Sequence, residues 1–288
     1  MQNIQQALFR EERALFGSKN LLIENSVFEN GESPLKECCD LTLKTCLFGW
    51  KYPLWYCRNI LAERSTWTDT ARAGVWYSEN VTLRDCLVQA PKTFRRCHGL
   101  TLDNTVLSRA EETLWHCENV NLKNVTVHGD YFAMNCEGVM VENLKLDGNY
   151  GFDGVKNVTI RSSHLVTKDA FWNSENVTVE DSFISGEYLG WNAKNLTLKN
   201  CTIESLQGLC YIDNLKLINC RLMHTTFAFE YTTLDASVAG RIDSVLNPAS
   251  GTLRADEIGE LILEQDKIDQ SKTVFDANVR KRVDKPIW

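Results

Sequence analysis

Apolar and polar positions recur along this chain with a period of 19 to 21 residues. We call the first residue of each copy the anchor and number the other positions of the copy from it. Repeats of this length are typical of solenoids, in which each copy forms one turn that stacks on its neighbours. The eleven anchors are Asn20, Asp40, Asn59, Asn80, Gly99, Asn119, Gly138, Asn157, Asn176, Asn195 and Asn214.

The alternation within each copy predicts short strands. Positions +1 and +3 are apolar in nearly every copy while +2 and +4 are polar, which is the pattern of a half-buried strand. Position +5 is mostly Asn, Asp or Ser, which tolerate the left-handed backbone of a sharp corner. A second strand follows, with +6 and +8 inward, and a third is expected just before the next anchor. We therefore predict an all-β fold, a single-stranded right-handed parallel β-helix of about eleven regular rungs plus an irregular C-terminal end.

A row of charges supports the parallel register. Position +4 alternates strictly in sign over ten consecutive copies: Glu24, Lys44, Glu63, Arg84, Asp103, Lys123, Glu142, Arg161, Glu180 and Lys199. Residues so far apart in sequence have no local reason to alternate. In stacked rungs each charge would face opposite charges above and below, and each such pair contributes roughly 0.2–1 kcal/mol.

The repeat runs through most of the chain, so we expect a single domain over residues 1–288. Residues 1–17 are expected to cap the first rung, residues 18–235 to form the regular rungs, and residues 236–288 to form irregular rungs and a C-terminal tail. A hydrophobic content of 43% in 288 residues is ample for a buried core.

The eleven cysteines follow the same register. Most occupy positions −2 or +6, which the pattern directs inward, so we interpret them as buried free thiols. The adjacent pairs Cys97–His98 and His116–Cys117 look like zinc ligands, but successive strand residues point to opposite faces. We therefore expect no disulfide, no metal and no cofactor.

Charge and hydropathy exclude several classes of partner. The net charge is −7 and the basic residues are scattered, which argues against nucleic acid. No apolar stretch approaches the ~18 residues of a membrane span. The first residues lack the apolar segment of a secretory signal, so we expect a reducing, cytoplasmic location. These patterns leave the oligomeric state open.

Aromatic residues concentrate just before each anchor. Positions −5 and −2 are apolar or small, so if both point inward, −4 or −3 lies at a bulge. Arg95 and Asp153 share the −4 row, and burying an unpaired charge is costly, so we favour a partly exposed row. Strict alternation would instead bury the tryptophans, and this alternative stays open. The −4 row contains Trp55, Trp76, Arg95, Trp115, Met134, Asp153, Trp172 and Trp191.

A second charged row lies at position −8. Glu111 and Asp130 fall on successive rungs, and two neighbouring carboxylates raise the pKa of one of them, as acid–base catalysis requires. Lys168 and Glu187 also fall on successive rungs and are equally consistent with a plain ion pair. Solvated loop charges are the alternative for every member of the row.

Aromatic rings beside carboxylates suit a carbohydrate chain, because sugar faces stack on rings and acids hydrogen-bond hydroxyls. Our first hypothesis is an intracellular carbohydrate-binding or carbohydrate-modifying protein, hydrolase-like or lyase-like, with an oligosaccharide as ligand. Whether it is an enzyme stays open. The catalytic candidates are Glu187, Glu230 and Asp153; the binding candidates are Trp172, Trp191, Tyr211, Gln207, Trp115, Glu111 and Asp130. The alternative is a non-catalytic scaffold whose Trp/Tyr face docks another protein or a second copy of the chain.

Several phrases resemble a bacterial family of unknown function with this fold. They are GESPLKE from Gly31, WKYPLWY from Trp50, GEYLGW from Gly186, QGLCY from Gln207, FEY from Phe229 and SVLNPASG from Ser244. The resemblance covers essentially the whole chain; Gly208 stands where the family's motif has proline. It implies a single-stranded right-handed β-helix within the pectate-lyase-like superfamily, whose members mostly bind or cleave polysaccharides. It implies no reaction or cofactor, and the superfamily's calcium-binding Asp cluster and catalytic Arg have no recognisable match here.

Overall fold

The structure is a computed structural model that describes residues 2–284. The chain forms two compact units, residues 1–148 and residues 149–288, which we call unit 1 and unit 2. Each unit is a right-handed parallel β-helix, and each is described by itself.

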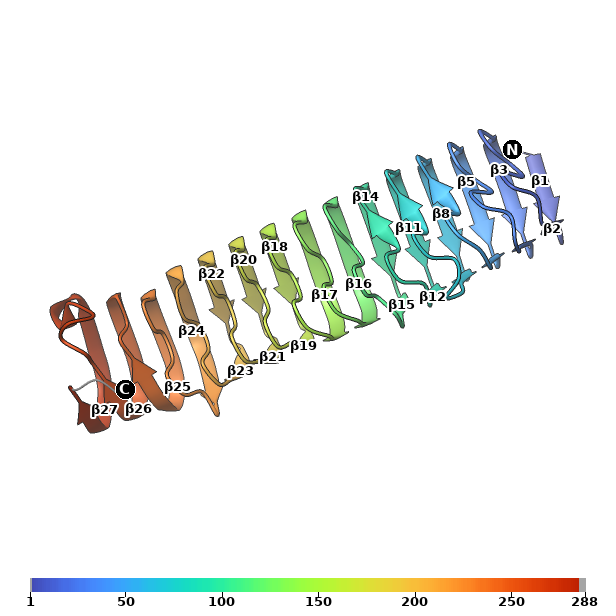
Figure 1. The fold of residues 1–288 in the computed structure, drawn as a ribbon. Coiled ribbons are helices and arrows are strands. Elements are labelled where there is room, and N and C mark those ends of the chain that lie inside the picture. Colours follow the sequence, from blue (N-terminus) through green and yellow to red (C-terminus); the bar gives the residue numbers. More distant parts are fainter. Residues whose placement is uncertain (1, 285–288) are drawn as a thin grey trace. The chain divides into compact units, whose positions relative to one another are not determined.

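Unit 1 consists of short strands that pair in parallel from one turn to the next (Figure 1). Leu21, Leu41 and Ile60 are partners in three successive strands, so equal repeat positions stack, as the sequence predicts. The strands of unit 1 are β1 (Gln2–Gln5), β2 (Leu8–Phe9), β3 (Lys19–Glu24), β4 (Val27–Phe28), β5 (Cys39–Lys44), β6 (Leu47–Phe48), β7 (Leu54–Trp55), β8 (Arg58–Glu63), β9 (Thr66–Trp67), β10 (Val75–Trp76), β11 (Glu79–Arg84), β12 (Leu87–Val88), β13 (Phe94–Arg95), β14 (His98–Asp103), β15 (Val106–Leu107), β16 (Glu118–His128) and β17 (Glu137–Asp147).

Unit 2 continues the same construction with longer strands toward the C-terminus. Its strands are β18 (Lys156–Arg161), β19 (His164–Val166), β20 (Glu175–Glu180), β21 (Phe183–Gly186), β22 (Lys194–Lys199), β23 (Thr202–Ser205), β24 (Asp213–Met223), β25 (Thr233–Leu246), β26 (Ser250–Ile262) and β27 (Thr273–Val283), with a 3₁₀ helix η1 (Gln270–Lys272). The pairings β24–β25, β25–β26 and β26–β27 are parallel and each carries a register shift.

Left-handed backbone forms the corners of the turns. Every anchor and every +5 residue has a φ between 46° and 70°, which explains why Asn, Asp and Gly recur there. A third corner lies at −3, where Tyr56 and Arg96 have φ values of 57° and 52°. The bulge predicted at −4 or −3 is therefore at −3.

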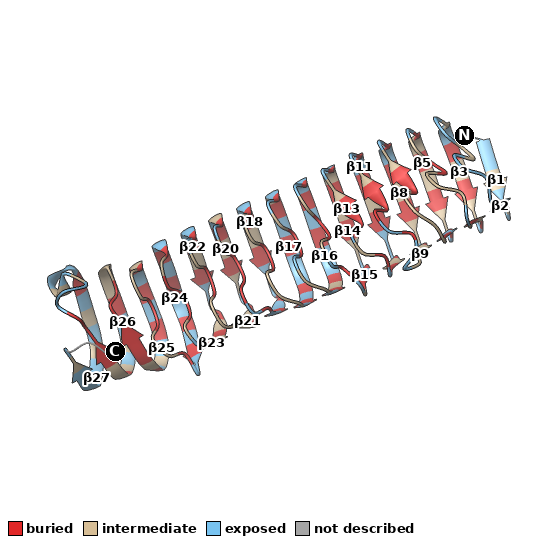
Figure 2. Ribbon diagram, viewed as in Figure 1, coloured by how far each residue is buried: buried red, intermediate tan, exposed pale blue. Residues whose placement is uncertain are grey.

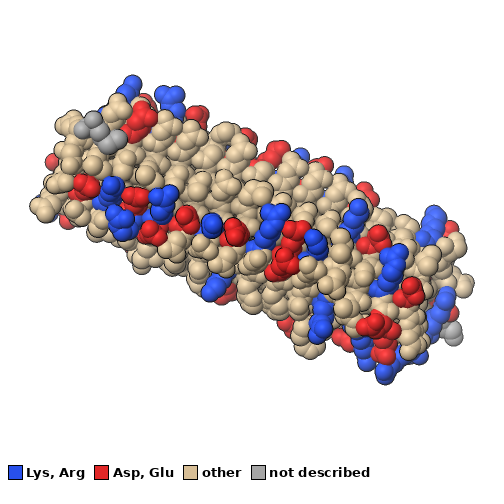
Figure 3. Space-filling view, turned by 180° about the vertical axis from the view of Figure 1, so that it is seen from behind, with Lys and Arg blue, Asp and Glu red and all other residues tan. Residues whose placement is uncertain are grey.

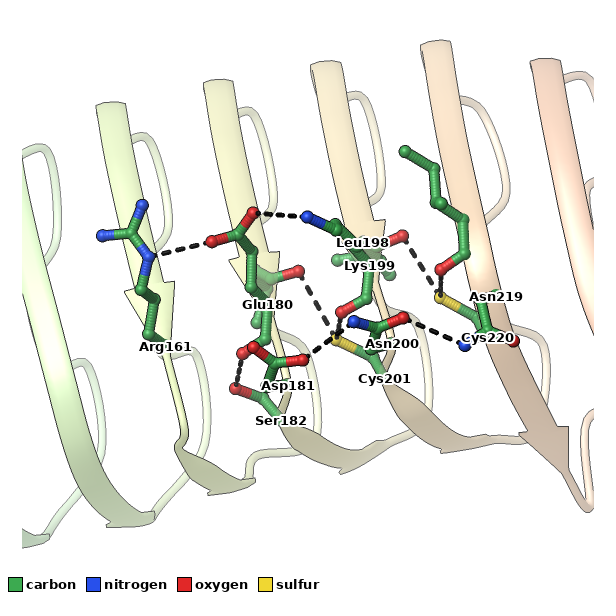
Figure 4. A network of polar contacts seen from close by, with 12 residues as sticks. Arg161, Glu180, Asp181, Ser182, Leu198, Lys199, Asn200, Cys201, Asn219 and Cys220 are labelled. Atoms are coloured by element: carbon green, nitrogen blue, oxygen red, sulfur yellow. Dashed lines mark hydrogen bonds and ion pairs between the residues drawn. The ribbon is translucent and has the colours of Figure 1, made fainter.

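The anchor asparagines also tie successive turns together. The amide of Asn59 donates to Asp40 Oδ1 at 2.8 Å, and the amide of Asn80 donates to Asn59 Oδ1 at 3.1 Å. In unit 2 the amides of Asn200 and Asn219 extend a second ladder at +5, starting from Asp181 (Figure 4).

The core lies inside each turn, and buried positions recur from turn to turn in both units (Figure 2). In unit 1 the +8 side chains form a stack of rings in which Phe28, Phe48 and Trp67 follow one another at 4.9 and 4.7 Å between centroids. Ten of the eleven cysteines are buried, all eleven are free, and Cys39 is half-buried. The thiols are thus part of the core, as predicted.

The charge row at +4 forms ion pairs between turns. In unit 1, Arg84 lies 3.1 Å from Glu63. In unit 2, Glu180 lies 2.8 Å from Arg161 and 3.6 Å from Lys199 (Figure 4). Acidic and basic side chains are accordingly interspersed on the face drawn in Figure 3.

Three features differ from the predicted layout. Residues 2–9 form strands that pair with β3 and β4, so the N-terminal segment adds a turn of its own. A third strand before the anchor occurs within residues 2–284 only as β7, β10 and β13, because from Leu114 onward position −5 adopts left-handed backbone that interrupts an extended segment. After Tyr231 the chain continues as the long strands β25, β26 and β27, so parallel stacking extends beyond residue 235, with a register shift in each pairing. The single-domain assignment stays a prediction, and residues 285–288 of the expected tail lie outside the described residues.

Candidate functional site

The −4 row of unit 1 is half-buried, so the partly exposed alternative is confirmed there. Trp55 and Trp76 lie parallel, with 5.1 Å between ring centroids and 4° between ring planes. Their indole N–H groups donate to the carbonyls of Ala73 at 2.6 Å and Lys92 at 2.7 Å, in the loop of the following turn. Each of these tryptophans is therefore hydrogen-bonded to the loop of the following turn, and the two rings cover one another's faces.

Arg95 fills the next place in this row. Its guanidinium lies 4.7 Å from the ring centroid of Trp76 and 4.6 Å from that of Trp115, a double cation–π contact. It also lies 3.4 Å from Glu112. The Trp115 face predicted to stack on a sugar therefore carries the Arg95 guanidinium.

The two carboxylates predicted to act together in unit 1 have different surroundings. Glu111 is exposed and Asp130 is half-buried, and the backbone N–H of Glu112 donates to the Asp130 carbonyl. Glu112, the neighbour of Glu111, is the residue that pairs with Lys92 at 3.0 Å and with Arg95. The catalytic or binding roles of Glu111 and Asp130 stay predictions.

Unit 1 also has a polar cleft of about 350 Å³, lined by Arg96, Cys97, His98, His116 and Glu118. The anchor Gly99 has no side chain to contact the amide of the next anchor, Asn119. That amide lies 2.8 Å from His98 Nε2 instead. The lining of the cleft contains two imidazole rings but no Trp, Tyr or Phe side chain.

The aromatic row of unit 2 is arranged differently. Trp172 and Trp191 are separated by 6.1 Å between centroids and are tilted by 36°. Trp191 then stacks on Tyr211 at 4.3 Å and 30°, and Tyr211 is tilted by 53° against Tyr231. The rings therefore splay apart between Trp172 and Trp191.

A cleft of about 300 Å³ opens at this splay, lined by Trp172, Tyr188, Trp191 and Gln207. The indole N–H of Trp172 donates to the Tyr188 carbonyl at 2.6 Å, which fixes the loop that carries Tyr188. Tyr188 lies edge-on to Trp191, with 6.1 Å between centroids and 87° between planes. The structure thus brings together three of the predicted binding residues, Trp172, Trp191 and Gln207, and adds Tyr188.

The loop conformation at −7 accounts for the opening. In unit 1 each residue at this position has left-handed backbone: Arg13, Ser33, Tyr52, Ala73, Lys92, Glu112 and Tyr131. In unit 2, Tyr150 keeps this conformation with a φ of 57°, whereas Asp169, Tyr188 and Gln207 occupy the same position of the next three turns without a positive φ. The loops therefore follow a different path where the cleft forms.

Asp153 and Asp169 form a partly buried carboxyl pair in unit 2. Asp153 Oδ1 accepts the backbone N–H of Trp172 at 3.2 Å. Burial, and to a lesser extent the charge of Asp169, raise the pKa of Asp153 to about 7. Asp169 is buried, its Oδ1 has no hydrogen-bond partner within residues 2–284, and burial raises its pKa as well.

Glu187, predicted as a catalytic acid or base, forms the ion pair that the sequence left as an alternative. Its carboxylate lies 3.3 Å from Lys168 Nζ. The same contact raises the pKa of Lys168. Glu187 is held beside a cation, next to the buried Asp169.

Glu230 is half-buried, and its pKa is raised chiefly by burial, with the charge of Glu264 adding to the shift. The Gln207 amide donates to Glu230 Oε2 at 3.4 Å. Behind it, the buried Glu264 accepts the amide of Asn247 at 2.6 Å, while its Oε1 has no partner among the described residues. Burial beside Glu230 also raises the pKa of Tyr211.

The spacing of these carboxyls limits what they do chemically. Asp153 and Glu230 are separated by four turns along unit 2, through Trp172, Trp191 and Tyr211. At ~4.8 Å per turn this is roughly 19 Å along the axis, against the ~5–9.5 Å between the two carboxyls of a glycosidase. Asp153 and Glu230 are therefore too far apart to act on one glycosidic bond, and Glu187 is the predicted residue that lies between them.

Sequence reasoning missed Tyr188, Asp169 and Glu264. Tyrosine recurs at −7, as Tyr52, Tyr131, Tyr150 and Tyr188, and this recurrence was a usable signal for Tyr188. Asp169 occupies the same row, but its burial depends on the altered loop. Glu264 lies beyond the regular repeat, where the register gives no guidance.

No group of three or more His, Cys, Asp or Glu side chains within residues 2–284 is placed to hold a metal ion. Within the same residues, no helix has the length and hydrophobicity of a membrane span.

The stacked parallel turns and left-handed corners define a right-handed parallel β-helix protein with an aromatic cleft on its surface. Residues 2–276 match the family described as "Protein of unknown function (DUF3737)", and the chain belongs to that family. This confirms the family resemblance seen in the sequence.

Solved β-helix structures are similar over most of their length. The A-module of mannuronan C-5 epimerase AlgE6 from Azotobacter vinelandii is 13% identical with a TM-score of 0.40, covering 99% of this chain and 91% of that one. PfbA, a surface adhesin of Streptococcus pneumoniae, is 8% identical with a TM-score of 0.40, covering 99% and 87%. At these values neither similarity supports an argument about function. No curated protein matches the chain significantly.

Proposed function

We propose that this protein binds a carbohydrate chain in the aromatic cleft of unit 2. The observation that carries the proposal is the tilt between Trp172 and Trp191, which together with Tyr188 and Gln207 line a cleft of about 300 Å³. An apolar cleft with a few polar groups is the usual form of a small-molecule site. Here the Gln207 amide belongs to the lining, and it donates a hydrogen bond to the neighbouring Glu230 carboxyl.

The ring faces and the polar groups suit the two sides of a sugar. The apolar face of a pyranose packs on an indole, while its hydroxyls exchange hydrogen bonds with amides and carboxyls. In unit 1 the corresponding ring faces are occupied by Trp55, Trp76 and Arg95 themselves. Unit 2 is therefore the better ligand surface of the two.

Modification of the bound sugar is the finer form of this proposal. Glu187 and Glu230 are its candidate acid and base, whereas Asp153, four turns from Glu230, lies too far away to assist at the same bond. The raised pKa of Glu230 suits a proton donor, and Glu187, which lies 3.3 Å from Lys168, is left as the candidate base. If turnover of a bound oligosaccharide is found, Glu187→Gln and Glu230→Gln should each abolish it, and full activity in both variants would contradict the assignment.

The test of binding uses intrinsic tryptophan fluorescence and melting temperature across a panel of neutral and uronic oligosaccharides. Trp191→Ala is expected to weaken binding about tenfold, because a ring contact is worth ~1–1.5 kcal/mol. Trp76→Ala, which removes a stacked ring of the same row in unit 1, is the matched control and should leave the affinity unchanged.

The panel also discriminates the alternative. A protein that responds to no oligosaccharide, and whose mass in solution exceeds that of one chain, would be better described as an oligomerising scaffold. We also propose a cytoplasmic location, which the eleven free thiols support because such thiols persist in reducing compartments.

A further inference from the structure

The groups around the unit 2 cleft are mostly acidic. Asp153 and Asp169 lie at the Trp172 end, Glu187 lies in the loop beside Tyr188, and Glu230 lies beyond Gln207. The basic Lys168 at this place is already paired with Glu187 at 3.3 Å. Lys168 also interacts with Asp169, so among the described residues an arriving anion would meet at the Trp172 end several carboxylates and a lysine that they already share.

Asp169 makes this end of the cleft costly for added negative charge. Only 3% of the residue is exposed, and its Oδ1 has no partner within residues 2–284. An unpaired buried carboxylate oxygen leaves a negative potential that water does not screen. Asp153 feels that potential, since the charge of Asp169 contributes to raising its pKa to about 7.

The Glu230 end repeats the arrangement. Glu264 is 4% exposed, its Oε1 is unpartnered among the described residues, and its charge helps to raise the pKa of Glu230. Lys267 opposes this shift but does not reverse it. Each end of the aromatic row thus has a partly exposed carboxyl with a buried carboxylate behind it.

Carboxyls of this kind suit uncharged ligands. When protonated, Asp153 and Glu230 donate hydrogen bonds to sugar hydroxyls; when ionised, they accept them. A uronic acid chain carries one carboxylate per residue, ionised above about pH 4, which would lie against these groups. Like charges brought together in a partly desolvated site are strongly unfavourable.

We propose that the unit 2 cleft selects uncharged sugar chains and rejects uronic acid chains. This inference rests on the proposed function, because it names the class of sugar that the same cleft binds. It assigns Asp153 and Asp169 to ligand discrimination at the Trp172 end and Glu230 with Glu264 to the same task at the other end.

The experiment compares neutral and anionic tetrasaccharides of equal length by calorimetric titration at pH 6 and pH 8. The neutral probes are cellotetraose and maltotetraose, and the anionic probe is tetragalacturonate. We expect the better neutral probe to bind at least about tenfold more tightly than tetragalacturonate at pH 6. The ratio of the two affinities should widen at pH 8, because Asp153 ionises between the two values; the charged group that acts on it is Asp169, which itself interacts with Lys168 and Glu187.

Two further measurements locate the discrimination. Asp153→Asn should lower the ratio of neutral to anionic affinity at pH 8 by about threefold or more. Asp69→Asn, which removes an exposed carboxylate of unit 1, should leave this ratio unchanged. If Asp153→Asn fails to fold, the unaltered protein in 0.5 M salt serves instead, since screening should narrow the ratio in the same direction.

The outcomes separate the two proposals. Equal or tighter binding of tetragalacturonate would overturn the selection of neutral chains and leave carbohydrate binding intact. A ratio that does not respond to pH, salt or Asp153→Asn would also overturn it. Failure of all three probes to bind would remove the proposed function and this inference with it.

Discussion

The aromatic rows of the two units occupy the same position of the repeat but are packed differently. In unit 1 Trp55 and Trp76 lie parallel within 4°, and Arg95 covers the next ring face. In unit 2 Trp172 and Trp191 are tilted by 36° and both line a cleft. Tryptophans at the same repeat position thus cover each other's faces in unit 1 and line a cleft in unit 2.

This difference shows that an aromatic row on a β-helix is not by itself a sugar platform. Rings at equal positions of successive turns are ~4.8 Å apart, which is close enough for neighbouring rings to stack and cover each other's faces. A ring face becomes available to a ligand only where the loop path changes, as it does at Asp169, Tyr188 and Gln207. Substitutions of corresponding side chains in the two units test this comparison.

The largest expected effect concerns the two tryptophans themselves. Trp76→Ala should lower the free energy of unfolding by about 3 kcal/mol, because it removes contacts on both ring faces and a 2.7 Å hydrogen bond to Lys92. Trp191→Ala should cost only about 1.5 kcal/mol, since its indole N–H has no protein partner within residues 2–284 and one side borders the cleft. Urea unfolding followed by circular dichroism measures both, and equal costs would mean that the two rows are energetically alike.

The next effect is the pH dependence introduced by Asp153. Its pKa in the folded protein is about 7, above the unfolded value near 4, so the folded state holds the proton more tightly. Stability from this group is full below pH 4 and is lost as the pH rises from 4 to 7. Asp153→Asn should therefore stabilise the protein by about 2 kcal/mol at pH 8, allowing for partial solvent exposure, and by much less at pH 4.5.

Melting temperatures at pH 4.5 and pH 8 check this expectation. Asp69→Asn is the control, because it removes an exposed carboxylate from unit 1 and should shift neither value appreciably. A stabilisation by Asp153→Asn that is equal at both pH values would show that the buried charge is not its cause.

A smaller effect is expected for the cation that closes the unit 1 row. Arg95→Met should cost about 1 kcal/mol, because it removes two cation–π contacts and the pair with Glu112. Its Nε is buried without a partner in the described chain, which keeps the net loss small. Arg96→Met, at the exposed neighbouring position, should change stability by less than about 0.5 kcal/mol. If the two substitutions changed the free energy of unfolding equally, the contact of Arg95 with Trp76 and Trp115 would not be the stabilising one.

The smallest effect should be the same in both units, because the +4 charge row is built alike. Glu180→Gln removes pairs with Arg161 and Lys199, and Glu63→Gln removes the pair with Arg84. Each variant should lose about 0.5 kcal/mol at low salt and less in 1 M salt. A much larger loss in one unit would show that the difference between the units extends beyond the aromatic row.

The sequence predicted the fold well because the determining interactions repeat. Asn59 and Asn80 lie one turn apart and occupy equal corners, so a single pattern of 19 to 21 residues specifies every turn. The inward cysteines and the +4 ladder followed from the same register, which also limited the bulge to −4 or −3; the backbone of the folded chain places it at −3. The pattern was less informative about the third strand, because whether position −5 is extended or left-handed depends on the loop before it.

The candidate site was only partly predictable. Trp172, Trp191 and Gln207 belong to the predicted set and meet at one cleft, whereas Trp115 faces Arg95. Nothing in the composition of the −4 row distinguishes Trp76 from Trp191. Their difference depends on ring orientation and on neighbours contributed by other turns.

The amino-acid sequence by itself determined that this chain is a parallel β-helix with buried thiols, corner asparagines and an aromatic row before each anchor. This was possible because stacking brings equal positions of successive turns into contact, so the repeat pattern shows which residues pack together. Only the tertiary structure decided which rings stay open and which carboxyls have a raised pKa. Those properties depend on the loop path around Tyr188 and on the burial of Asp169 and Glu264, which arise from contacts between non-equivalent positions that no repeat encodes.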